Sequence, residues 1–237
     1  TQAPTGVGGS TCDDARPVGN ATYAASSGTS HSAPAVSGVA SLVYWWLRNN
    51  PQDNLLFDGG ATSLTAPSPA GLKAYLLAHP TPLNGVSNSG NLPTQTQGYG
   101  MPNMDLLFDS TPKFMVDQTV TFDNSGGANY QWIGAIADSA KPVRVVLTWT
   151  DAPGPLSGNA YINNLNLEVE VNGTTYKGNV FNGHTSTTGG TADAVNNYEA
   201  VFLPPGTSGA ITVRVIPTNI AGDGVPNSGD ATDQDFA

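Results

Sequence analysis

Ser30 is the residue whose type and position best suit chemistry in this sequence. A serine hydroxyl becomes an effective nucleophile when a nearby base takes its proton. The negative oxygen that forms on the attacked group needs N–H donors already in place. Ser30 directly follows Gly28 and Thr29, where an apolar helical pattern begins. Because the start of a helix offers N–H groups and the positive end of its dipole, this position predicts a nucleophile on a rigid support.

The helix that must hold Ser30 is expected to begin at that residue and to stop at Asn49-Asn50-Pro51. Pro34 falls near its first turn, where a missing N–H costs little. One apolar face is expected to be buried under the site, and it consists of Ala33, Val36, Val39, Ala40, Val43 and Leu47. A serine-capped helix after a glycine turn, which is common and needs no chemistry, is the alternative interpretation.

Further helices are predicted only in the first half of the chain. One covers residues 68–78, with Ser68 as its cap and Pro69 in its first turn. His79 at its end suits the helix dipole as a cation. A short helix is predicted around residues 101–108.

After about Asp109 the apolar residues alternate with polar ones, which indicates β-strands. Turn signals such as Asn172-Gly173 separate the alternating runs. The pattern predicts an all-β sandwich. The predicted strands are residues 114–122, 143–150, 165–171, 198–203 and 211–216.

Composition excludes some classes of protein. Eighteen acidic and eight basic residues give a formal net charge of −10, so we expect no nucleic-acid partner. The sequence has no apolar run of about 20 residues, so we expect no membrane span. Low lysine content with abundant Ser, Thr, Asn and Gly is typical of secreted enzymes. Cys12 is the only cysteine, and it is either a lone thiol or half of a pair whose partner is missing.

The segment from Gly28 to Gly38 closely resembles the serine signature of the subtilases, the subtilisin-like serine proteases. Gln97-Gly98-Tyr99-Gly100 resembles the segment that closes their catalytic domain. The resemblance implies that residues 1–110 are the C-terminal part of an α/β subtilase catalytic domain. It assigns Ser30 as the catalytic nucleophile, with Gly28 and Thr29 contributing to binding at the site, and a polypeptide as substrate.

Three later segments resemble the jelly-roll domain that follows the catalytic domain in one subtilase branch. They begin at Leu147, Ile162 and Asn196. The resemblance implies that residues 111–237 form a jelly-roll-like β-sandwich. In the middle segment Asn164 and Asn166 replace two acids that this branch usually has, so a charge-dependent role of that segment is in doubt.

The subtilase triad order of Asp, then His, then Ser is not met. Only 29 residues precede Ser30 and none is a histidine, because the three histidines are His31, His79 and His184. His31 is the next residue on the helix, rotated by about 100° from Ser30. We therefore expect the triad Asp and His on an upstream N-terminal part of the catalytic domain, and no triad-based activity from this chain alone.

Two arrangements explain that pattern. The chain is either a C-terminal piece of a longer protease or one chain of a nicked enzyme. A different class of function also stays open: a non-catalytic secreted sandwich, derived from a protease, that serves in binding or assembly.

Calcium is the one cofactor that the sequence suggests. Calcium binds several oxygen ligands from carboxylates, amides and carbonyls. The loop between residues 179 and 197 offers Asn179, Asp193, Asn196 and Asn197 and resembles a calcium site of the sandwich-bearing subtilases. The tail is a second acidic segment, with Asp223, Asp230, Asp233 and Asp235. For both segments a solvated acidic turn is the alternative.

Overall fold

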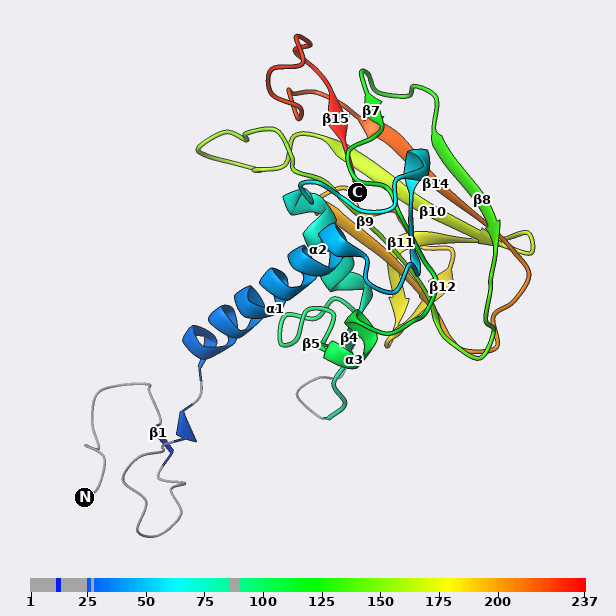
Figure 1. The fold of residues 1–237 in the computed structure, drawn as a ribbon. Helices are drawn as coiled ribbons and strands as arrows, with labels where there is room; N and C mark the ends of the chain where they lie inside the picture. The colour runs from blue at the N-terminus through cyan, green and yellow to red at the C-terminus, as the bar shows by residue number, and fades with distance from the viewer. Residues whose placement is uncertain (1–11, 14–24, 27, 86–89) are drawn as a thin grey trace, which may run out of the picture. The chain divides into compact units, whose positions relative to one another are not determined.

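Figure 1 shows the computed structural model of the chain, which describes residues 12–13, 25–26, 28–85 and 90–237. The packing divides the chain after Leu42, within the first helix, and the two units are described separately. Residues 43–110 pack in the same unit as the strands that follow. The predicted domain boundary near residue 110 stays a prediction. Cys12 lies in a described strand, but its side chain lies outside the described part.

The helices begin and end close to the predicted residues. Ser68 caps the second helix, where its hydroxyl oxygen accepts the Gly71 N–H at 2.8 Å. Asn103 caps the third with its side-chain oxygen. The Ser68 cap and the short helix were predicted and are confirmed, whereas the Asn103 cap was not predicted. The helices are α1 (Thr29–Asn49), α2 (Pro69–Ala78), α3 (Met104–Leu107) and the 3₁₀ turn Asp58–Gly60.

The larger sheet has five antiparallel strands in the order β12-β11-β10-β14-β8. The pair β13-β9 forms the opposing layer. The chain is mostly β-structure with few helices, as predicted for its second half. The strands of these two layers are β8 (Tyr130–Ala135), β9 (Val143–Thr148), β10 (Asn164–Val171), β11 (Thr174–Asn182), β12 (Thr185–Thr188), β13 (Tyr198–Leu203) and β14 (Ala210–Asn219).

Shorter strands form four further pairs. β3 and β6 run parallel, whereas the other pairs are antiparallel. The pairs are β1 (Cys12–Asp13) with β2 (Ala25–Ser26), β3 (Leu55–Phe57) with β6 (Lys113–Met115), β4 (Pro80–Thr81) with β5 (Met101–Pro102), and β7 (Thr121–Phe122) with β15 (Gln234–Asp235).

The prediction of one continuous strand over residues 114–122 is wrong. Gln118 has a φ of 57°, which breaks the extended chain, and its N–H donates to the Phe236 carbonyl at 2.9 Å. Asp117 beside it accepts the Ser68 N–H at 3.0 Å and also the Ser68 hydroxyl. The run is therefore split into β6 and β7 because its middle residues are tied to α2 and to the end of the chain.

The core lies between the two β-layers. Burial alternates along β10, where Leu165, Leu167, Val169 and Val171 are buried and the intervening residues are half-buried. Leu147, Trp149, Val201 and Leu203 of the opposing layer belong to the same cluster. The period-two pattern of the sequence is thus the packing pattern of the sandwich.

α2 lies against β9, on the face away from this core (Figure 1). Ala70 and Ala74 contact Val146 there, and their small side chains let the helix approach the strand closely. The predicted hairpin turn is also confirmed: Asn172 and Gly173 have φ values of 50° and 79°, as a type I′ turn requires. No helix in the described residues is long and apolar enough to span a membrane.

Candidate active site

Ser30 is the second residue of α1 and is exposed. Gly28 precedes the helix with a φ of 150°, and its carbonyl accepts the N–H groups of His31 at 3.0 Å and Ser32 at 3.2 Å. The first N–H groups that bond within the helix start are those of His31 and Ser32, and the Ser30 N–H precedes them in the sequence. Backbone N–H groups of a first turn have no partner within their own helix and can bind an anion. The helix start predicted from Gly28-Thr29-Ser30 is confirmed, and Gly28 and Thr29 are exposed beside the serine.

The predicted buried face of α1 is only partly right. Val43 and Leu47 are buried, but Ala33 and Val36 are exposed, and Val39 and Ala40 are half-buried. The N-terminal half of the helix thus carries apolar side chains that are exposed or half-buried in the described chain.

The structure does not bring a described histidine other than His31 into the unit of Ser30. His31 follows Ser30 on α1 and is exposed. His79 and His184 belong to the other packing unit. Within the described part of the unit that holds Ser30, His31 is thus the one histidine.

The prediction of a cationic His79 at the end of α2 is wrong. Burial lowers the pKa of His79 to about 4, so the ring is neutral near pH 7. Its Nδ1 lies 2.6 Å from the Tyr75 carbonyl and donates to it. The cation at this helix end is Arg144 of β9, which donates to the carbonyls of Ala78 at 3.1 Å and Pro80 at 2.6 Å. Arg144, which is distant in the sequence, therefore supplies the positive charge that was predicted for His79.

The predicted calcium ligands meet only in part. Asn179 and Asn196 each place their Nδ2 2.7 Å from Asp193 Oδ2. Asp193 Oδ1 accepts the N–H groups of Val195 at 2.9 Å and Asn196 at 3.1 Å. Burial alone would raise the pKa of Asp193, but these hydrogen bonds outweigh it and lower that pKa. The carboxylate is therefore an anion surrounded by N–H donors.

The orientation of the Asn179 amide is fixed by the backbone. Its Nδ2 also donates to the Tyr198 carbonyl at 2.9 Å, and its Oδ1 accepts the Ala200 N–H at 3.0 Å. Tyr99, of the Gly-Tyr-Gly segment, donates its hydroxyl to the same Oδ1. The cluster is thus a polar network that ties residue 99 to the sandwich. In this arrangement its residues do not fit calcium, because nitrogen atoms face the carboxylate.

Asn197, the fourth predicted ligand, turns to other partners. Its Oδ1 accepts from Lys73 Nζ at 2.8 Å, and its Nδ2 donates to the Trp149 carbonyl at 2.9 Å. The acidic tail is similar: buried Asp233 accepts the Val225 N–H at 2.9 Å and the Ser228 hydroxyl at 2.6 Å. Among the described residues, no three acidic, histidine or cysteine side chains gather as a metal site.

Glu199 is a buried acid that the sequence analysis did not single out. It lies on β13 with no exposed surface, and its Oε2 accepts the Leu167 N–H at 2.7 Å. Burial raises its pKa to about 8. The Glu199 side chain lies against Gly178. A Cβ added at Gly178 would lie 2.1 Å from Glu199 Oε2, so the absence of a side chain there makes room for the carboxyl group. Every residue from Glu199 to Leu203 is buried, so the alternation along this strand gave no signal that could have revealed Glu199.

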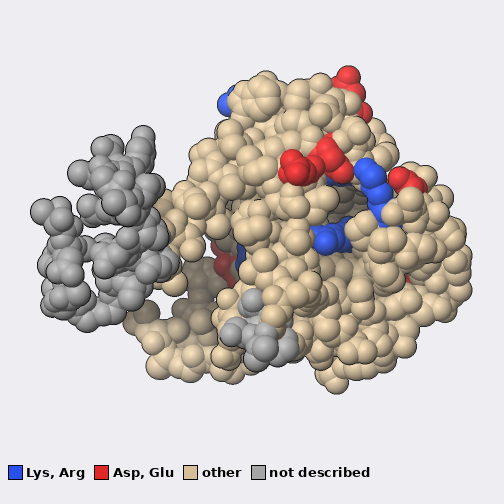
Figure 2. All heavy atoms as spheres, turned by 90° about the horizontal axis from the view of Figure 1, so that it is seen from below, with Lys and Arg blue, Asp and Glu red and all other residues tan. Residues whose placement is uncertain are grey.

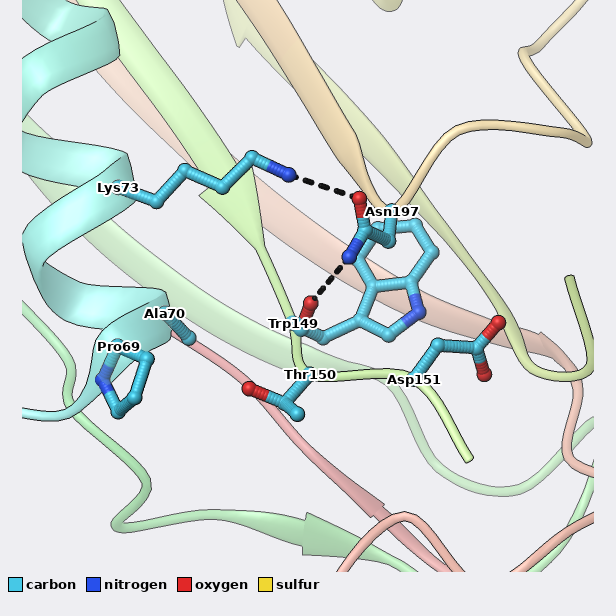
Figure 3. Close-up of a pocket in the computed structure, with 7 residues that line it drawn as sticks. All are labelled: Pro69, Ala70, Lys73, Trp149, Thr150, Asp151 and Asn197. Atoms are coloured by element: carbon cyan, nitrogen blue, oxygen red, sulfur yellow. Dashed lines mark hydrogen bonds between the residues drawn. The ribbon is translucent and has the colours of Figure 1, made fainter. Parts of the chain in front are cut away.

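Lys73 is the other residue that was missed, and it is the single charged residue of α2. Figure 3 shows it beside a pocket of about 370 Å³ that Pro69, Ala70, Trp149, Thr150, Asp151 and Asn197 also line. Charged side chains are sparse on the face seen in Figure 2. The ion pairs among the described residues join Asp109 to Lys113 and Lys141, and Glu170 to Arg214, so Lys73 is in none of them.

No family model and no curated protein matches this chain.

Proposed function

We propose that this chain is the C-terminal part of a secreted subtilisin-like serine endopeptidase, with Ser30 as the nucleophile that forms the acyl-enzyme. The observation that carries the proposal is the start of α1, where Ser30 follows Gly28 at a φ of 150° and is exposed in the first helical turn. The partner is an upstream polypeptide that supplies the triad Asp and His, and the substrate is a polypeptide.

The uncovered half of α1 supports a missing partner. Val36 is 41% exposed and Leu42 is 50% exposed. The exposed part of an apolar side chain contributes no hydrophobic stabilisation to the fold. A helix of such residues is typically stable when its apolar face is packed. An upstream α/β portion that covers this face would complete the core beneath Ser30.

In the complete enzyme the upstream His takes the proton of the Ser30 hydroxyl as its oxygen attacks the peptide carbonyl. The Ser30 N–H, at the positive end of α1, donates to the oxyanion. The His then protonates the leaving amine, and a water molecule hydrolyses the acyl-enzyme. Gly28 allows the chain to enter the helix in this tight turn.

Peptide hydrolysis tests the proposal. The purified 237-residue chain should give no serine-dependent turnover, whereas the chain produced together with the sequence that precedes it in its gene should hydrolyse casein. Ser30→Ala should abolish that activity, and Ser32→Ala, a change at the neighbouring exposed serine of the same turn, should leave most of it. Activity that survives Ser30→Ala would sink the proposal.

The second candidate is a non-catalytic sandwich used for binding or assembly. The closed core between β10 and the β13-β9 layer favours it, because this part needs no partner to bury its apolar residues. The sequence that precedes this segment in the gene distinguishes the two functions. An Asp followed by a His, in the order of the subtilase triad, favours the protease, whereas a native start close to Thr1 favours the binding module.

A further inference from the structure

We propose that the pocket between α2 and the end of β9 binds a single carboxylate group of a peptide, held by Lys73. The inference does not depend on the chemistry of Ser30. It rests on the position of one cation, the shape of the pocket beside it and the acid at the pocket's other end.

The pocket is a small, open hollow lined from α2, the end of β9 and the loop before β13. Its volume of about 370 Å³ is at the lower end of the range typical of such sites, about 300–1,000 Å³. Pro69 of α2 provides exposed apolar surface, Ala70 and Trp149 line the pocket with little exposed surface, and Thr150 adds a hydroxyl. It thus has room for a small polar group with limited apolar contact.

Lys73 provides the charge for that group. Its Nζ lies 2.8 Å from Asn197 Oδ1 and 4.6 Å from the centre of the Tyr198 ring, and the residue is half-buried. These neighbours are neutral, and Lys73 forms no ion pair with another described residue. An ammonium group has three N–H donors and is costly to bury without a counter-charge. A ligand carboxylate in the adjoining pocket would provide that counter-charge.

The position of the ammonium group is set in advance. Asn197 donates its Nδ2 to the Trp149 carbonyl at 2.9 Å, which turns its Oδ1 toward Lys73 (Figure 3). Less ordering of Lys73 is therefore needed when a ligand binds, and this preorganisation favours binding.

Asp151 restricts which anions fit. Its carboxylate lies on the far side of the Trp149 ring from Lys73 (Figure 3), and its oxygens accept the N–H groups of Ile162 and Asn163, each at 2.8 Å. It places a carboxylate at that end of the pocket. A ligand with one carboxylate at the Lys73 end is accepted, and a ligand with a second negative charge near Asp151 is repelled.

Isothermal titration at pH 7 and low salt tests the site with the 237-residue chain. The probes are N-acetyl-Ala-Ala with a free C-terminal carboxylate, the same dipeptide as its amide, and N-acetyl-Glu-amide, whose only carboxylate is in the side chain. We expect saturable binding of at least one carboxylate probe, and none of the dipeptide amide. Which carboxylate probe binds more tightly distinguishes a chain terminus from an acidic side chain.

The variants locate the binding. Lys73→Met, which keeps most of the aliphatic length, should weaken binding at least tenfold, and Lys73→Arg should retain it. Lys177→Met is the matched control, because Lys177 also donates to an oxygen, that of Gly190, away from the pocket. Asp151→Asn should improve binding of a dicarboxylate such as N-acetyl-Ala-Glu. Equal binding of the amide, an unchanged affinity in Lys73→Met, or no binding of either carboxylate probe would overturn the proposal.

Discussion

The N-terminal half of α1 and the β-sandwich solve the same problem of apolar surface in opposite ways. The sandwich buries its alternating residues between two layers, so that Leu165 and Val169 have no exposed surface. The helix carries Val36 and Leu42 largely exposed and presents Ser30 at its start. The sandwich thus buries its apolar residues within the described chain, whereas the helix that carries Ser30 keeps exposed apolar side chains, which the proposed upstream partner would cover.

Matched leucine truncations should give the largest contrast. Leu167→Ala, at a side chain that is 1% exposed, should lower the free energy of unfolding by about 2–5 kcal/mol because it opens a cavity in the core. Leu42→Ala, at 50% exposure, should change it by about 0.5 kcal/mol or less. Urea unfolding of the 237-residue chain measures both. Similar losses in the two variants would show that the helix half is already packed.

A pH series should sharpen the description of the sandwich interior. The pKa of Glu199 is about 8 in the folded protein and near 4.5 when unfolded, so the unfolded state loses its proton first. The part of the stability that depends on Glu199 is therefore full below about pH 4.5, falls as the pH rises toward 8 and is level above it. The fall should be of the order of a few kcal/mol.

Glu199→Gln should remove most of this fall, measured as the difference in urea midpoint between pH 5 and pH 8.5. A similar fall in the Gln variant would mean that another group causes it. His79 acts at the other side of the range: its lowered pKa gives stability that is present above about pH 6.5 and lost toward pH 4.

How much of this was predictable depends on where each partner lies in the sequence. Ser68 and the Asn172-Gly173 turn act within a few residues, and their roles were predicted. The break at Gln118 depends on Phe236, and the burial of Glu199 depends on Gly178 in another strand. Contacts of this kind arise from the tertiary fold, so propensity and periodicity do not show them.

At the candidate sites, too, local features were predicted and features that depend on distant residues were not. The helix start at Ser30 was predicted because glycine, serine and the helix are neighbours in sequence. Asn197 was predicted as a calcium ligand from its loop, but its amide is directed by Lys73 and Trp149, which lie far from it in the chain. The identity of a donor can be predicted locally, whereas its orientation cannot.

Removing one hydroxyl should test the link between residue 99 and the sandwich. Tyr99→Phe deletes the donor to Asn179 Oδ1 and should cost about 1 kcal/mol in the free energy of unfolding. Tyr161→Phe is the control, because its hydroxyl is an exposed acceptor from Asn159, and should cost close to nothing. Equal effects would show that the buried network adds no stability.

Calcium should have the smallest effect. Because N–H donors surround the Asp193 carboxylate, thermal melts in millimolar calcium and in chelator should coincide within error. A rise in Tm with calcium that disappears in Asp193→Asn would instead assign a cation to this loop and would require the Asn179 and Asn196 amides to turn.

Labelling with a serine-directed fluorophosphonate tests the central claim most directly. The probe should modify Ser30, located by peptide mass spectrometry, when the chain is produced with its upstream polypeptide, and should leave the isolated chain unmodified. Ser32, exposed in the same turn, should stay unlabelled in both samples. An unlabelled Ser30 in the complete protein, or equal labelling of Ser30 and Ser32, would contradict the account.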